Sequence, residues 1–185
     1  MSKITIMGFD PSFRNFGMAK GIFDLETGEL ENLQLALSES QASANKKAVR
    51  VNSDDLERAR KQYNALSQFI EGVDLMCVEI PVGSQSARAM ASYGISIGII
   101  STLQVPMIQV TPTEVKMVTG HKNATKAQMI DWAYAQFPQA NWLTSKSKGQ
   151  TKLIGKNEHM ADALAAIYAG VNTEQFRQAR ALLIK

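Results

Sequence analysis

Two carboxylates in this sequence directly follow apolar runs. Asp10 ends the run from Ile4 to Phe9, and Glu79 ends the short run LMCV. Both runs have the length and composition of buried strands. An ionised carboxylate beside buried apolar groups is costly unless a cation meets it. For Asp10 taken alone, the alternative is an ordinary turn residue that ends a strand, since Asp is common in turns.

The two acids would act together if their strands were neighbours. Adjacent strands lie about 4.8 Å apart, which would bring the carboxylates of Asp10 and Glu79 close together at one edge of a sheet. Two carboxylates that close repel, so one holds a proton unless a cation neutralises the pair. Oxygen ligands suit Mg²⁺ or Mn²⁺, so this edge is a candidate site for a hard divalent ion.

Further ligands occur near the end of the chain, in the segment EHMADALAAIYAG. His159 and Asp162 are three residues apart and therefore project from one face of a helix that is otherwise small and apolar. The alternatives are a histidine satisfied at the helix end and, for Glu158, a solvated acid that favours the helix dipole. Three acids and a histidine can hold two ions about 4 Å apart, an arrangement that supports in-line phosphoryl displacement.

The strands and helices that would position these residues are expected to follow one another in a mixed α/β order along the chain. The pattern predicts three antiparallel strands, then parallel strands alternating with helices, and a final set of helices. Strands are expected at 3–10, 16–24, 30–37, 74–81 and 106–112, and helices at 54–71, 87–103, 113–118, 125–137 and 158–170, with a further C-terminal helix at 173–183. Ser53 and Asn157 are the predicted caps of the first and last major helices. Residues 38–53 and 138–157 are polar and predicted to be loops.

Composition is that of one ordinary globular domain spanning residues 1–185. Hydrophobic residues make up 45% and charged residues 20% of the chain. The single cysteine, Cys77, cannot form an internal disulfide, which favours a reducing compartment. No apolar run is long enough for a bilayer and the N-terminus does not resemble a signal peptide, so we expect a cytoplasmic protein. The net charge of +3 is small, so a polyanionic partner would have to meet local basic patches.

Basic residues do gather in three parts of the chain. A single lysine in a loop is usually only solvated, but three groups around one acidic site fit a protein that accepts DNA phosphates. The groups are Lys46, Lys47 and Arg50; Lys116, Lys122 and Lys126; and Lys146, Lys148, Lys152 and Lys156.

Four motifs together resemble those of the RuvC family of Holliday junction resolvases, within the RNase H-like superfamily. GFDPSFRNFG (8–17) is similar to the family's first strand motif, and VEIP (78–81) to its second acidic motif. TPTEVKMVTGHKNATKAQMI (111–130) resembles the region with Val-Lys, a Gly turn and Lys-x-Gln. HMADALA (159–165) resembles the closing motif. The matches occur in order over residues 4–170.

The resemblance implies an RNase H-like five-stranded sheet flanked by helices. It implies that Asp10, Glu79, His159 and Asp162 hold Mg²⁺ or Mn²⁺, with two ions expected. It places Lys116 and Lys126 beside the cleaved phosphate. It also implies a homodimer that makes paired nicks in opposing strands of a four-way junction. Helix 87–103 would be a core or dimer element, the alternative being that it packs on its own sheet.

One departure from the family pattern concerns an aromatic residue soon after the second acid, which helps open the junction by stacking on bases. The nearest aromatic after Glu79 here is Tyr93. The loop GSQSARAM, through Ser84 and Arg88, is an alternative DNA contact. Ser12 and Arg14 follow Asp10 in its turn and are candidates for touching the scissile backbone.

The sequence therefore predicts a metal-dependent endonuclease for four-way junctions. Two alternatives stay open at this stage. One is a nuclease for other branched DNA or for RNA–DNA hybrids. The other is a catalytically silent junction-binding protein on the same fold.

Overall fold

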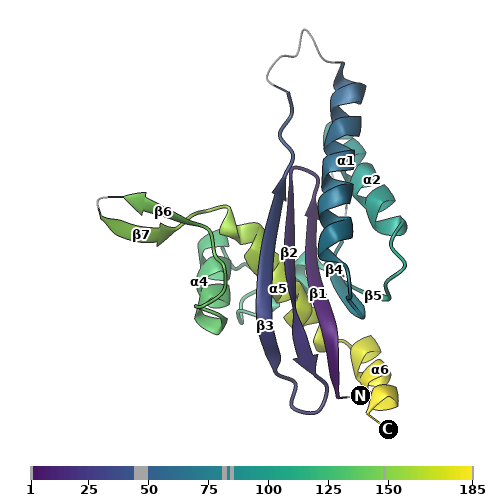
Figure 1. Cartoon of the computed structure of the whole chain (residues 1–185), viewed down its shortest axis with the longest axis vertical. Helices are drawn as coiled ribbons and strands as arrows, with labels where there is room; N and C mark the ends of the chain where they lie inside the picture. Colours follow the sequence, from purple (N-terminus) through teal and green to yellow (C-terminus); the bar gives the residue numbers. More distant parts are fainter. Residues whose placement is uncertain (1, 44–49, 81–82, 84–85, 148, 185) are drawn as a thin grey trace.

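A mixed five-stranded sheet forms the centre of the protein (Figure 1). The structure, a computed structural model, describes residues 2–43, 50–80, 83, 86–147 and 149–184. The order of the strands is β3-β2-β1-β4-β5; the first three pair antiparallel, and β4 and β5 continue parallel to β1. The predicted fold class and the predicted neighbourhood of the first and fourth strands are confirmed. The strands are β1 (Lys3–Ser12), β2 (Asn15–Asp24), β3 (Leu30–Glu39), β4 (Leu75–Glu79) and β5 (Met107–Val110).

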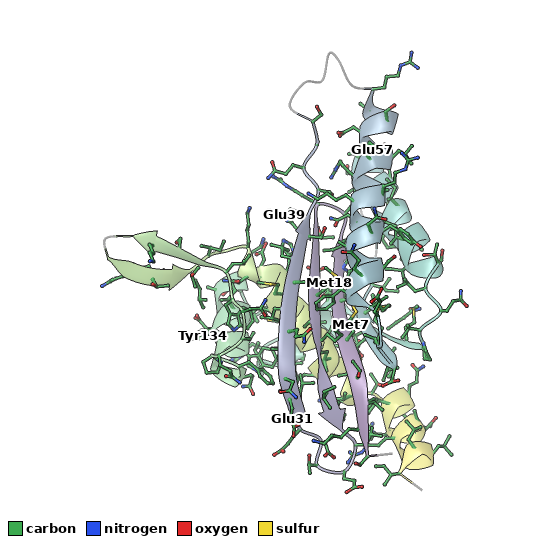
Figure 2. The ribbon with its side chains drawn as sticks, in the orientation of Figure 1. Met7, Met18, Glu31, Glu39, Glu57 and Tyr134 are labelled. Atoms are coloured by element: carbon green, nitrogen blue, oxygen red, sulfur yellow. The ribbon has the colours of Figure 1, made fainter. Side chains whose placement is uncertain are left out.

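Helices cover both faces of this sheet and enclose two apolar cores. On one face, α1 and α2 pack over alternate residues of β1 and β2, including Met7 and Met18, which Figure 2 labels. On the other face, α5 packs its alanines against the sheet, with α3, α4 and α6 around it. No helix in the described part of the chain is long and apolar enough to cross a membrane. The helices are α1 (Val51–Phe69), α2 (Ala87–Ser101), α3 (Pro112–Met117), α4 (Lys126–Gln136), α5 (Asn157–Val171) and α6 (Glu174–Leu183).

Both predicted helix caps are wrong. Helix α1 begins at Val51, so Ser53 lies inside its first turn, and the N-cap residue Arg50 makes no side-chain cap. Helix α5 begins at Asn157 itself. The buried Asn157 amide donates to the carbonyl of Leu143 at 2.8 Å, and its Oδ1 accepts from the Leu143 N–H at 2.9 Å. The Asn157 side chain, which local propensity predicts to cap the helix, is thus bonded to a distant part of the chain instead.

Residues 138–157 are not the structureless loop that the sequence predicts. Strands β6 (Thr144–Ser147) and β7 (Gln150–Leu153) form an antiparallel ribbon, which projects away from the body in Figure 1. The described side chains of both strands are exposed except for the half-buried Leu153. A ribbon that buries so little has no reason to alternate apolar and polar residues, so its sequence lacks the usual strand signal.

The close approach of α5 to the sheet depends on two glycines. A Cβ added to Gly8 on β1 would overlap the carbonyl group of Ala163, and one added to Gly17 on β2 would overlap the carbonyl group of His159. The backbone of α5 therefore lies directly on the two strands, with the buried Ala163 at the contact with Gly8. This contact fixes the height and the rotation of α5 over the end of β1.

We expect Gly17→Ala to destabilise the protein by about 1–3 kcal/mol, the usual cost of overpacking a well-packed core, because the methyl group must push α5 outward. Gly98→Ala on α2 is the matched control, since an added Cβ there meets no described atom within 4 Å. It should be neutral or stabilise by up to about 1 kcal/mol, because alanine favours a helix over glycine. Urea unfolding followed by circular dichroism measures both, and equal stabilities would contradict the close-packing argument.

Candidate active site

Asp10 and Glu79 lie at equivalent places on neighbouring parallel strands. Phe9 pairs with Val78 in the ladder between β1 and β4, so each acid is the next residue along its strand. Side chains alternate across a sheet. Because Gly8 contacts α5 and Cys77 contacts Gly170 of α5, the acids two residues further on face α5 as well. The strand register thus confirms the prediction that Asp10 and Glu79 are neighbours at one edge of the sheet.

Helix α5 brings His159 and Asp162 to the same edge. Nδ1 of His159 lies 2.8 Å from Oδ2 of Asp10, and both side chains are 15% exposed. The other ring nitrogen, Nε2, is 2.9 Å from Nδ2 of Asn15 on β2. Both nitrogens are thus hydrogen bonded, so His159 orients Asp10 in this state. Sequence reasoning missed Asn15, because its partnership with His159 arises only from the β1–β2 register and the position of α5.

Burial is the main cause of the shifted pKa values at this site. Burial, together with the charges of Asp10 and Asp162, raises the pKa of Glu79 to about 8. Burial and the charge of Asp10 likewise raise the pKa of Asp162 to about 7. Burial also raises the pKa of Asp10, although the bond from His159 opposes that rise. Burial lowers the pKa of His159, but the bond to Asp10 and the charges of Asp10, Glu158 and Asp162 together outweigh it and leave the pKa above its usual value.

Two lysines flank the acids. A hollow of about 250 Å³ is lined by Asp10, His159 and Asp162 and also by Ser12, Lys116 and Lys126. Lys116 lies near enough to lower the pKa values of Glu79 and Asp162 slightly, yet it makes no ion pair with a described residue. Nζ of Lys126 lies 2.8 Å from Glu158 Oε2. Glu158, one of whose oxygens is 3.4 Å from His159 Nε2, therefore belongs to the edge of this site.

The donor set fits a hard divalent cation by its chemistry. Three half-buried carboxylates, Asp10, Glu79 and Asp162, supply the oxygen ligands that Mg²⁺ and Mn²⁺ prefer. Among the described residues, however, no three His, Cys, Asp or Glu side chains are already arranged to grip an ion. Coordination by His159 would require one of its two hydrogen bonds to break, so its role as a ligand stays a prediction.

The structure brings some of the predicted DNA contacts to the acids and leaves others apart. Ser12 and Arg14 border the site, from the end of β1 and the turn after it. Arg88 makes a bidentate ion pair with Asp55 of α1, at 2.5 and 2.6 Å. The other predicted DNA contacts that the structure describes are exposed and do not line the hollow at the acids: Arg50, Lys122, Lys146 and Lys152. Lys46, Lys47, Ser84 and Lys148 are outside the described residues.

Solved structures share this architecture over nearly the whole chain. RuvC of Thermus thermophilus covers 96% of this chain and 97% of its own, with a TM-score of 0.61 and 17% sequence identity. The same protein in complex with a Holliday junction substrate covers 96% of both chains, with a TM-score of 0.59. The fold is that of RuvC. No protein-family model matches the sequence, and a search of curated protein sequences gave no match.

The raised pKa values predict how stability depends on pH without metal. Between the unfolded values near 4 and the folded values of about 8 for Glu79 and about 7 for Asp162, the folded state binds more protons than the unfolded state. Stability should therefore fall as the pH rises through this window. We expect the melting temperature in EDTA to be lower at pH 8 than at pH 5.5, and Glu79→Gln to reduce that difference. A difference unaffected by Glu79→Gln would contradict the assignment.

Proposed function

We propose that the protein is a metal-dependent endonuclease that cuts branched DNA, with four-way junctions as its main substrate. One observation carries the proposal: two adjacent strand ends and one helix bring Asp10, Glu79 and Asp162 to a single sheet edge, with Lys116 and Lys126 beside them. Such a set of hard ligands flanked by cations suits a reaction at a phosphodiester. The likeness to RuvC in fold is consistent with this chemistry.

In the proposed reaction, the three carboxylates hold Mg²⁺ or Mn²⁺, with two ions expected. Divalent ions bound there supply neutralisation of the phosphate and activation of the attacking water. His159 holds one oxygen of Asp10 in place and thereby orients the other. Lys116, which has no ion-pair partner among the described residues, offers its charge to the phosphate at the edge of the hollow. Lys126 would reach the phosphate only by leaving Glu158.

Beyond the acids, the β6–β7 ribbon favours a large anionic partner. A two-stranded ribbon alone is marginally stable in water, and this one buries little of itself. Lys146 and Lys152 are exposed on it, and the chain contains no acid between Asp131 and Glu158. We propose that the ribbon lies along one arm of the DNA. Paired nicks in opposing strands need two active sites, so we also propose a homodimer.

The experiment that tests this function compares substrates. Four-way junction, fork, flap, linear duplex and RNA–DNA hybrid are each incubated with protein in Mg²⁺, Mn²⁺ or EDTA. Symmetric metal-dependent nicks on the junction support the proposal. Preferred cutting of the fork, flap or hybrid would make that nucleic acid the main substrate in place of the junction. Junction binding without any cutting would show a junction-binding protein and not a nuclease.

Asp10→Asn tests the mechanism directly. We expect cleavage to fall by at least about 10³-fold, because ion-dependent stabilisation worth several kcal/mol is lost. Junction affinity should be equal or tighter, because one negative charge near the phosphates disappears. Glu57→Gln is the matched control, since this exposed α1 acid, labelled in Figure 2, pairs only with Arg60 among the described residues. Cleavage that survives Asp10→Asn would remove the acid cluster from the reaction.

A further inference from the structure

The β6–β7 ribbon is fixed at its base by two asparagine amides. Nδ2 of Asn141 donates to the carbonyl of Leu35 at 2.8 Å, and its Oδ1 accepts from the Leu35 N–H at 2.9 Å. Asn157 binds both backbone groups of Leu143 in the same way. Each amide thus takes the place that a peptide group has in a strand ladder. One ties the segment before the ribbon to the edge strand β3, and the other ties it to the start of α5.

Further contacts hold the segments that lead into and out of the ribbon. The buried ring of Trp142 donates through Nε1 to a backbone carbonyl at 2.9 Å. After β7, Nζ of Lys156 lies 2.7 Å from Oε1 of Glu39, the last residue of β3. The chain then enters α5, and His159 follows in its first turn. The base of the ribbon is therefore bonded to the same helix that carries residues of the proposed site.

The ladder of the ribbon places lysines on both of its faces. Residues directly opposite each other share a face, and successive residues along a strand alternate between faces. Lys146 stands opposite Thr151, and Ser145 stands opposite Lys152. Lys146 and Lys152 therefore project from opposite faces, and both are exposed. Charge on both faces suits a place where anionic groups lie on either side of the ribbon.

The rest of the ribbon is polar without being acidic. Residues 144–152, TSKSKGQTK, contain hydroxyl, amide and ammonium groups and neither a carboxylate nor a large apolar side chain. Protein partners usually bury an apolar core in their contact, and this segment supplies none. Hydrogen-bonding groups flanked by cations instead suit the base edges and phosphates of a nucleic-acid groove.

The dimensions of the ribbon fit one groove of B-DNA. A single layer of strands with side chains on both faces is about 10 Å thick, the spacing of stacked sheets. The major groove is about 12 Å wide and admits a two-stranded ribbon, whereas the minor groove is only about 6 Å wide. Strands of four residues extend about 13 Å, more than the major-groove depth of about 8.5 Å. The ribbon, which projects from the body in Figure 1, is thus long enough to reach the base edges.

We infer that the β6–β7 ribbon enters the major groove of one duplex arm, tip first, with Lys146 and Lys152 on phosphates of the two opposite walls. The inference rests on the proposed nuclease function and specifies how the arm is held. Asn141 and Asn157 are positioning residues, because they fix the direction in which the ribbon leaves the body. With the arm held at one angle to α5, one phosphate near the branch reaches the acids. The ribbon thus sets where the strand is cut.

The first test identifies the groove that the ribbon occupies, without cleavage. Dimethyl sulfate methylates N7 of guanine, which lies in the major groove, and N3 of adenine, which lies in the minor groove. With the junction bound in Ca²⁺, we expect N7 to be protected over a short tract of one arm and N3 there to stay reactive. Combining Lys146→Ala with Lys152→Ala should remove the protection. Protection confined to N3, no protection, or N7 protection that survives both substitutions would overturn the inference.

The second test counts the phosphate contacts. Each phosphate neutralised on B-DNA adds about 0.9 to the magnitude of the slope of log K against log salt. Lys146→Ala and Lys152→Ala should each reduce that magnitude by about 0.9, and together by about 1.8. Lys61→Ala is the matched control and should leave the slope unchanged, since this exposed lysine lies on α1 beside a groove next to β3. An effect of only one of the two ribbon lysines would put a single face on the DNA and contradict entry into a groove.

The third test concerns the asparagines and uses cleavage in Mg²⁺. Asn141→Ala should spread the nicks over several phosphates, because the ribbon no longer leaves the body in one direction. Asn172→Ala is the matched control, since this exposed amide binds the carbonyl of Tyr168 at 2.8 Å at the other end of α5. Asn141 is exposed, so its variant decides the point even if a variant of the buried Asn157 does not fold. Weaker cleavage with the nicks still at one phosphate would remove the positioning role.

The two proposals fail in distinguishable ways. If no branched DNA is cut in Mg²⁺ or Mn²⁺, the nuclease function fails, while N7 protection in Ca²⁺ that depends on Lys146 and Lys152 still supports the ribbon in the groove. If cutting depends on Asp10 while the protection and the salt slope do not respond to the two lysines, the ribbon inference fails and the nuclease stands.

Discussion

The packing of α5 directly on β1 and β2 is the contact on which the site depends. Gly8 and Gly17 leave room for the helix backbone, and the alanines of α5 let the layers close. At this distance His159 reaches Asp10, and Asp162 lies within electrostatic reach of both strand-end acids. A larger residue at either glycine would separate the helix acid from the strand acids. The same steric requirement at Gly8 and Gly17 therefore determines both the packing of the core and the positions of the acids.

The same packing creates an electrostatic conflict. Three carboxylates lie together in a partly buried place, where burial raises the pKa of each and the charge of Asp10 further raises those of Glu79 and Asp162. A proton or a divalent cation resolves the conflict, and the hard oxygen donors favour Mg²⁺ or Mn²⁺. Lys116 and Lys126 line the hollow at the edge of the cluster, where Lys126 pairs with Glu158. Under the proposed function, the binding of an ion and the binding of DNA would both depend on this charge distribution.

The sequence predicts the parts of this arrangement that arise from local pattern. Apolar runs that end in Asp10 and Glu79 predict both strands, and helical spacing predicts the shared face of His159 and Asp162. The ribbon at 144–153 could not be predicted, because a strand pair without a buried face shows no alternation. The role of Asn15 depends on its contact with His159, a residue distant in sequence. Asn157 misled the prediction of a cap because its side chain binds Leu143 instead.

Diffraction from crystals grown with Mn²⁺ tests the central claim most directly, since the anomalous signal locates the ion independently of any activity. The account predicts at least one strong Mn²⁺ peak between Asp10, Glu79 and Asp162, with oxygens from all three within coordination distance, and loss of that peak in Glu79→Gln. A site that stays empty at millimolar Mn²⁺ and neutral pH or above, or an ion bound elsewhere on the chain, would contradict it.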